Sequence, residues 1–86
     1  MKDLGSILKE VRLARGLDLG EVARRTCINP RYLRAMEDGK FNLIPKVFDK
    51  GYLKIYATHL ELDANPLLML LDQMKQNAAG LNNKTA

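Results

Sequence analysis

LGEVARRTCINPRYLRAMEDG, residues 19–39, is the stretch that decides the fold. It predicts two short helices joined by a tight turn. Asp18 begins a capping-box pattern before the first helix, and Asn29 can cap the second. Pro30 suits the first helical position because its missing N–H needs no partner there, and Gly39 ends the helix. The stretch therefore predicts a helix-turn-helix.

The apolar positions in this stretch have the spacing that two crossing helices need. A small alanine stands where the helices would cross closely, an isoleucine lies in the turn, and the later apolar residues would wedge against the N-terminal helix. These positions are Val22, Ala23, Ile28, Leu33 and Met36. The pattern is a strong indication of the motif, but a motif alone does not establish a function.

Three further helices are expected around the motif. Apolar residues recur at three- and four-residue spacing over residues 4–14, and similar patterns predict helices at 46–60 and 64–76. No stretch alternates polar and apolar residues with a period of two. We therefore expect an all-α domain of five helices over residues 1–76. Residues 77–86 have little to bury and are expected to form a flexible tail or linker.

The composition indicates a small soluble protein that suits an acidic partner. The net charge is +4, and residues 1–40 carry nine basic residues against six acidic ones. Such an excess fits a phosphate backbone, an anionic lipid or an acidic protein. The single cysteine, Cys27, has no partner for an internal disulfide and fits a reducing cytoplasm. The longest apolar run, residues 67–71, is far too short for a membrane span.

The residues offer no catalytic or metal-binding constellation. Cys27 has no second cysteine and His59 no second histidine, so a zinc site or a Cys–His pair lacks its remaining groups. The sequence has no glycine-rich phosphate-binding loop and no pair of carboxylates spaced for acid–base chemistry. We therefore expect a non-enzyme without cofactor, metal or small-molecule substrate.

The second helix of the motif is a candidate for reading DNA. Its outward side chains would be Arg31, Tyr32 and Arg34, and the arginines suit phosphates or guanine edges. Against this interpretation, Pro30 removes a backbone donor near the phosphates, and Glu37 with Asp38 adds negative charge. Two arginines on a solvated helix face explain these residues equally well. Sequence-specific DNA binding therefore stays open as an alternative.

Helix 46–60 carries more apolar surface than one small core needs. Two stripes run along it: the first consists of Phe48, Tyr52 and Ile55, and the second of Leu53, Tyr56, Ala57 and Leu60. Exposed aromatic residues beside lysines are typical of a protein-binding patch, but the last helix could instead cover the second stripe. Gly51, in the middle of the helix, suggests close approach by another backbone, either from this domain or from a partner.

The sequence resembles the cytoplasmic N-terminal domain of the RodZ family, a family of bacterial cell-shape proteins. The resemblance covers residues 4–71 and is most specific in NPRYLRAMEDG and in the later FDKGYLKIYATHLELD. It implies a five-helix, repressor-like domain that docks on the actin-like protein MreB. A basic stretch and a transmembrane helix normally follow in this family, so membrane attachment would need a segment outside this chain.

The resemblance also implies roles for residues of helix 46–60. Phe48 and Tyr52 would face MreB, and the less certain neighbours would be Lys50, Lys54 and Tyr56. The same resemblance turns Tyr56 inward, together with Leu53 and Leu60. The surface for MreB and the surface for DNA are then expected on opposite parts of the domain.

One ion pair is expected inside the domain. Arg12 near the end of the first helix and Glu37 late in the motif are similar to the internal Arg–Glu pair of repressor-type helix-turn-helix proteins. We assign this pair to structure, because losing one partner would leave an unpaired charge. Of the candidate functions, a RodZ-like adaptor is preferred to a DNA-binding regulator. A membrane-surface module is weakest because a basic amphipathic helix is missing.

Overall fold

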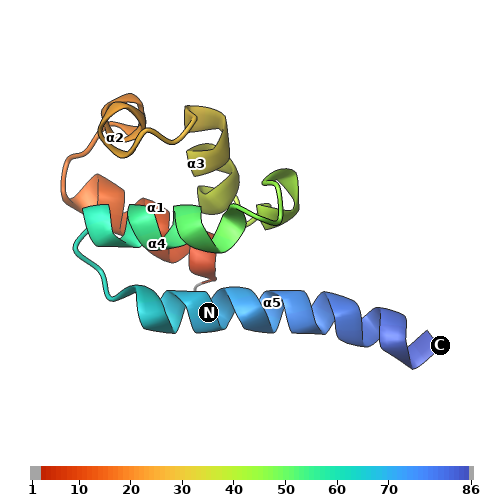
Figure 1. The fold of residues 1–86 in the computed structure, drawn as a ribbon. Helices are drawn as coiled ribbons and strands as arrows, with labels where there is room; N and C mark the ends of the chain where they lie inside the picture. Colours follow the sequence, from red (N-terminus) through yellow and green to blue (C-terminus); the bar gives the residue numbers. More distant parts are fainter. Residues whose placement is uncertain (1–2, 86) are drawn as a thin grey trace.

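The computed structural model describes residues 3–85, with side chains from residue 3 to residue 76. All regular structure in this part is helical, as Figure 1 shows. The elements in chain order are α1 (Leu4–Ala14), α2 (Leu19–Thr26), α3 (Pro30–Glu37), the short 3-10 helix η1 (Phe41–Leu43), α4 (Asp49–His59) and α5 (Ala64–Thr85). The predicted all-α class, with five helices and a helix-turn-helix at α2–α3, is confirmed.

Side-chain caps begin the first three α-helices. The carboxylate of Asp3 accepts a hydrogen bond from the Ser6 backbone N–H at 2.8 Å, and this bond lowers the pKa of Asp3. Asp18 accepts from the Glu21 N–H at 3.3 Å, and the Asn29 side chain accepts from the Arg31 N–H at 2.9 Å. Each cap satisfies a backbone donor that the helix itself leaves without a partner.

The core is centred on α3. This helix packs against α1, α2 and η1, while α4 packs against α2 and α5. Fully buried side chains from three helices meet there: Leu8, Leu33, Met36, Leu53 and Tyr56. A Cβ atom on Gly5 would lie 2.3 Å from the Glu37 carbonyl oxygen, so α1 can cross α3 this closely only at a glycine.

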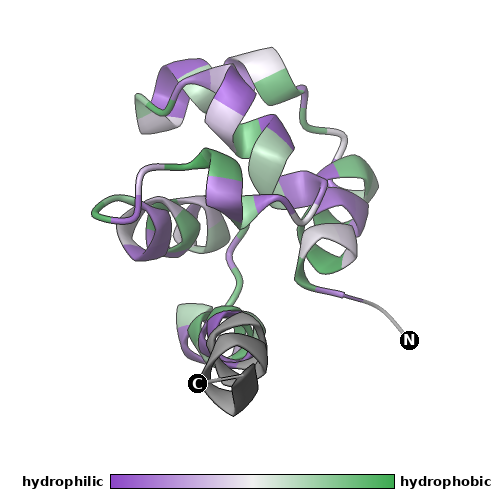
Figure 2. Ribbon diagram, turned by 90° about the vertical axis from the view of Figure 1, so that its right-hand side faces the viewer, coloured by the Kyte–Doolittle hydropathy of each residue, from purple (hydrophilic) through white to green (hydrophobic). Residues whose placement is uncertain are grey.

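α5 lies along the side of the domain opposite α2 and α3 (Figure 1), and Figure 2 shows it end-on below the other helices. Leu67 and Leu71 bury its inner side. The Nζ atom of Lys75 lies 2.6 Å from an oxygen of Asp49, whose side chain is buried at the start of α4. α5 is therefore held to α4 by apolar packing and by an ion pair.

Two helix boundaries differ from the sequence-based expectation. α4 begins at Asp49 rather than at residue 46, because Pro45 and the following turn precede it and no side chain caps its start. α5 continues to Thr85, through the segment expected to be a flexible tail. Side chains beyond residue 76 lie outside the described part, so a domain boundary at 76 stays a prediction. None of the helices in the described part is long and apolar enough to cross a membrane.

Candidate functional site

The outward side of α4 carries a group of accessible apolar residues. We define the α4 surface as Val47, Phe48, Gly51, Tyr52 and Ile55. Phe48 is 49% exposed, Ile55 is 44% exposed, and Val47, just before the helix, is 83% exposed. α4 lies on the side of the domain that faces the viewer in Figure 1. Adjacent exposed apolar side chains of this kind typically mark an interaction site.

Stacked rings order this surface. The Phe48 and Tyr52 rings lie 5.4 Å apart with an interplanar angle of 14°, and Tyr52 stacks in turn on Tyr32 of α3 at 5.8 Å and 28°. The aromatic residues are thus pre-arranged by one another. The stack also corrects one expectation: Tyr32, a candidate DNA contact, borders the α4 surface, so the two candidate surfaces are neighbours and do not lie on opposite parts.

Lysines surround the apolar residues. Lys46, Lys50 and Lys54 are all exposed. The Nζ atom of Lys50 lies 3.1 Å from a carboxylate oxygen of Asp72 on α5, in a pair that is about half exposed on both sides. Screening by water makes such a pair weak, so Lys50 can exchange Asp72 for another acidic group at little cost.

Tyr56 is not part of this surface. The resemblance implies both an inward position for Tyr56 and a place near the partner, and the structure buries Tyr56 completely. Its position on α4 is turned toward α3, where its hydroxyl donates a hydrogen bond to Glu37. The second stripe of the helix is core as well, since Leu53, Ala57 and Leu60 are fully buried.

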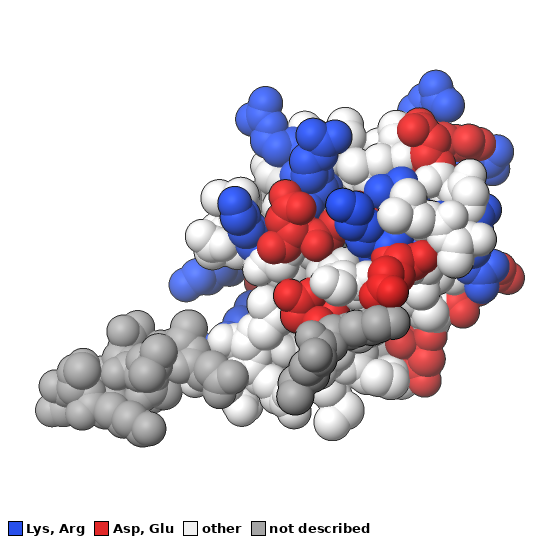
Figure 3. Space-filling model, turned by 180° about the vertical axis from the view of Figure 1, so that it is seen from behind, with Lys and Arg blue, Asp and Glu red and all other residues white. Residues whose placement is uncertain are grey.

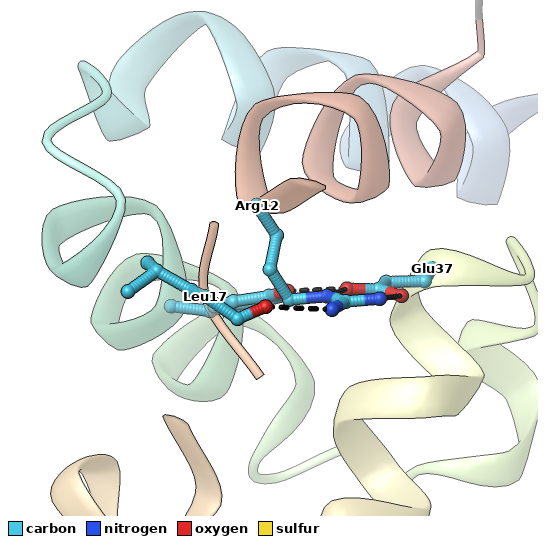
Figure 4. A network of polar contacts seen from close by, with 4 residues as sticks. Arg12, Leu17 and Glu37 are labelled. Carbon is cyan, nitrogen blue, oxygen red and sulfur yellow. Dashed lines mark hydrogen bonds and ion pairs between the residues drawn. The ribbon is translucent and has the colours of Figure 1, made fainter. Parts of the chain in front are cut away.

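Arg12, Glu37 and Tyr56 form one polar network behind α4. The Nε and Nη2 atoms of Arg12 donate to the two Glu37 oxygens at 2.6 and 3.1 Å, and Nη1 donates to the Leu17 carbonyl oxygen at 2.9 Å (Figure 4). The hydrogen bond to Glu37 raises the pKa of Arg12. Burial raises the pKa of the Tyr56 hydroxyl, and its bond to Glu37 adds to this. The network joins α1, α3 and α4 and fixes the inner side of α4.

The outward side of α3 keeps two of its three predicted contact residues fully accessible. Arg31 and Arg34 are exposed, and Tyr32 is half-buried by its stack on Tyr52. The sequence argument that Glu37 repels phosphates is wrong, because its carboxylate is buried and paired with Arg12. Of Glu37 and Asp38, the two acidic residues expected near the phosphates, only Asp38 is exposed.

A shallow hollow of about 310 Å³ lies between the ends of α1 and α4 and the side of α2. Charged groups at its edge pair with each other: Arg15 with Glu61 at 2.6 Å, and Arg25 with Glu21 at 3.2 Å. Acidic and basic side chains also lie side by side on the face seen in Figure 3. In the part of the chain with described side chains, no group of three or more potential metal ligands comes together.

Two residues of the α4 surface are absent from the predicted partner-facing set. Ile55 lies seven residues after Phe48, and periodicity places both in one apolar stripe of the helix, but the resemblance does not assign Ile55 a partner role. Val47 precedes the helix, where no periodic signal applies. Its exposure depends on how the connection from η1 enters α4.

Comparison with known proteins identifies a family and two relatives that this chain is similar to. A family model described as a helix-turn-helix domain matches residues 7–67. A cytoskeleton protein RodZ of Streptococcus pneumoniae is 36% identical over 72 residues, which make up 83% of this chain and 26% of that protein. An uncharacterized protein of Haemophilus influenzae is 35% identical over 60 residues, 67% of this chain and 20% of the relative. No solved structure matches.

The chain spans about a quarter of the Streptococcus relative and a fifth of the Haemophilus one. The family match is broad with respect to this chain, since it contains the α2–α3 motif and the α4 surface. The chain belongs to the helix-turn-helix domain family and is a RodZ-like member of it.

Proposed function

We propose that this domain is a non-catalytic, cytoplasmic adaptor that docks on the actin-like protein MreB through the α4 surface. The observation that carries the proposal is the stacked pair Phe48–Tyr52 on α4, in which Phe48 is 49% exposed and Tyr52 is partly buried, while the opposite side of the helix closes the core. The likeness to a cytoskeleton protein RodZ supports a role in cell shape. MreB as the partner comes from the family resemblance in the α4 sequence.

Each part of the α4 surface has a separate task in this proposal. Phe48 and Tyr52 offer large apolar area, and their stacking reduces the conformational entropy lost on binding. Aromatic residues of this kind usually contribute most of the binding energy in an interface. Lys50 and Lys54 lie at the edge, where charges speed association and orient the partner more than they add affinity.

The test is the affinity of purified MreB from the source organism for wild-type and variant domains. Phe48→Ala and Tyr52→Ala should each weaken binding about tenfold or more. Leu13→Ala is the matched control, because Leu13 is 58% exposed on α1 and distant in sequence from α4. It should leave the affinity within about twofold. Equal affinity of all four proteins, or no binding by the wild type, would refute the proposal.

DNA binding is the second candidate, and the exposed arginines of α3 favour it. Arg31 and Arg34 project from the helix that reads bases in helix-turn-helix proteins. A duplex-binding domain should lose affinity steeply as salt rises and should discriminate between sequences. If Arg31→Ala and Arg34→Ala abolish binding to one specific duplex while Phe48→Ala has no effect on MreB binding, DNA binding is the better account.

A further inference from the structure

Gly51 has no structural reason to be glycine within the described part of this domain. Gly16 and Gly39 have positive φ angles of 67° and 74°, and Gly5 lies against the backbone of α3. Gly51 lies in the first turn of α4, as its third residue, and a Cβ built on it would meet nothing within 4 Å. A glycine at such a position destabilises a helix relative to alanine. No contact in the described part of the domain offsets this cost.

The position of Gly51 on α4 shows which part of the surface a partner could approach closely. Gly51 points roughly 180° away from the side of the helix that Leu53 and Tyr56 bury in the core. Phe48 and Ile55 lie beside it on one flank, at spacings of three and four residues. Lys50 and Lys54 lie on the other flank. The missing side chain leaves the α4 backbone accessible between an apolar flank and a basic flank.

We propose that the main chain of the partner crosses α4 at Gly51, in direct contact with the helix backbone. This inference rests on the proposed function and names the geometry of that same site. The crossing segment is apolar toward Phe48 and Ile55 and acidic toward Lys50 and Lys54. Charge complementarity selects this chemistry, since Lys50 already pairs with a carboxylate, that of Asp72, in the free domain. A side chain at position 51 would hold the two backbones apart.

The proposal predicts that one added methyl group has opposite effects on stability and on binding. Gly51→Ala should raise the thermal unfolding midpoint by no more than about 4–8 °C, the value for a glycine in a helix interior, because alanine is the better helix former and meets no neighbour. The same variant should weaken binding to purified MreB about tenfold. Gly51→Gln should weaken binding further while keeping the helix, because the clash grows with the size of the side chain.

Gly20→Ala is the matched control. Gly20 is an exposed glycine in the first turn of α2, where an added Cβ meets only a side-chain oxygen of Asp18. It should leave MreB affinity unchanged. If Phe48→Ala weakens binding but both Gly51 variants bind like the wild type, the crossing at Gly51 is refuted and the adaptor function stands. A loss of stability in Gly51→Ala also refutes it. If Phe48→Ala binds as well as the wild type, both proposals fail together.

Discussion

Glu37 is a buried carboxylate that accepts hydrogen bonds from Arg12 and Tyr56. A buried charge is tolerated only when such partners compensate for its lost hydration. The three side chains come from three helices, so the network fixes how α1, α3 and α4 meet. At the residue scale, the stacked aromatic pair on the outer side of α4 depends on this inner network for its orientation.

Glu37→Gln should lower the free energy of unfolding by about 3 kcal/mol, because it leaves the Arg12 guanidinium without its charge partner in a buried position. Urea unfolding curves measure the change. Glu21→Gln is the control, since its pair with Arg25 is exposed and should contribute less than about 1 kcal/mol. Equal losses in the two variants would show that the buried network contributes nothing special.

Tyr56→Phe should lower stability by about 1–2 kcal/mol at pH 7, because it removes a hydrogen bond to a charged group. Burial raises the pKa of Tyr56 above its ordinary value of 10.0. The folded state then holds this proton more tightly than the unfolded chain. The stabilisation is complete below pH 10 and is lost as the pH rises above it.

The difference in unfolding free energy between wild type and Tyr56→Phe should therefore shrink between pH 10 and pH 11. Titration of the other groups affects both proteins alike and cancels in the difference. Unfolding by urea at pH 7, 9, 10 and 11 measures the trend. A difference that stays constant over this range would contradict the raised pKa.

At the scale of elements, the turn between α2 and α3 depends on a left-handed residue. Cys27 ends α2 with a φ angle of 60°, a conformation that residues other than glycine and asparagine rarely adopt. Its side chain is exposed, so packing does not hold it there. The turn must instead be held by its neighbours: Ile28 is buried, and its N–H donates to the Thr26 hydroxyl at 3.3 Å.

Cys27→Gly should keep or raise the free energy of unfolding, by up to about 1 kcal/mol, because glycine adopts a positive φ without steric strain. The greater entropy of glycine in the unfolded chain offsets part of this gain. Cys27→Val should lower stability by about 1–2 kcal/mol, since a β-branched residue suffers most in this conformation. Guanidinium unfolding of the three proteins checks the order, and a valine variant as stable as the wild type would contradict it.

The helices of the motif were predictable because their ends carry local signals. Asp18 and Asn29 cap in the structure as the sequence indicated, and the apolar positions of α2 and α3 are buried. The start of α4 carries no such signal, because Phe48 stands at its N-cap without a side-chain hydrogen bond. For this reason the start of the helix predicted from the sequence, residue 46, lies three residues before the observed start at Asp49.

The candidate site could be predicted only in part. Periodicity showed that α4 has two apolar stripes but not which of them faces the core, because contacts with α2, α3 and α5 decide that. Glu37 illustrates the same limit. From the sequence it has two incompatible roles, as the partner of Arg12 inside the domain and as a negative charge facing phosphates, and only the long-range pair with Arg12 in the fold decides between them.

At the scale of the whole molecule, α4 lies between two groups of contacts. α2 and α3 hold it from one side and α5 from the other, and its remaining side is the α4 surface. Because Tyr32 stacks on Tyr52, this surface continues onto α3. A large partner on α4 would therefore reach the helix that DNA would need.

A chain ending at residue 76 should have the same unfolding free energy as the full chain, within about 0.5 kcal/mol. Among the described side chains, Leu67, Leu71 and Lys75 hold α5 to the domain, and these three precede the cut. A chain ending at residue 70 loses Leu71 and Lys75 and should be less stable by about 3 kcal/mol or more. Urea unfolding compares the three chains. A large loss on cutting at 76 would place the domain boundary further along α5.

The central claim, that α4 rather than α3 is the partner-binding element, is tested most directly by an NMR titration. Purified MreB is added to the isotopically labelled domain, and backbone amide signals are followed residue by residue. The perturbed signals should lie at residues 47–55 and at Tyr32, which stacks on this surface. Perturbations confined to Arg31, Arg34 and the rest of α3, with α4 unchanged, would contradict the claim.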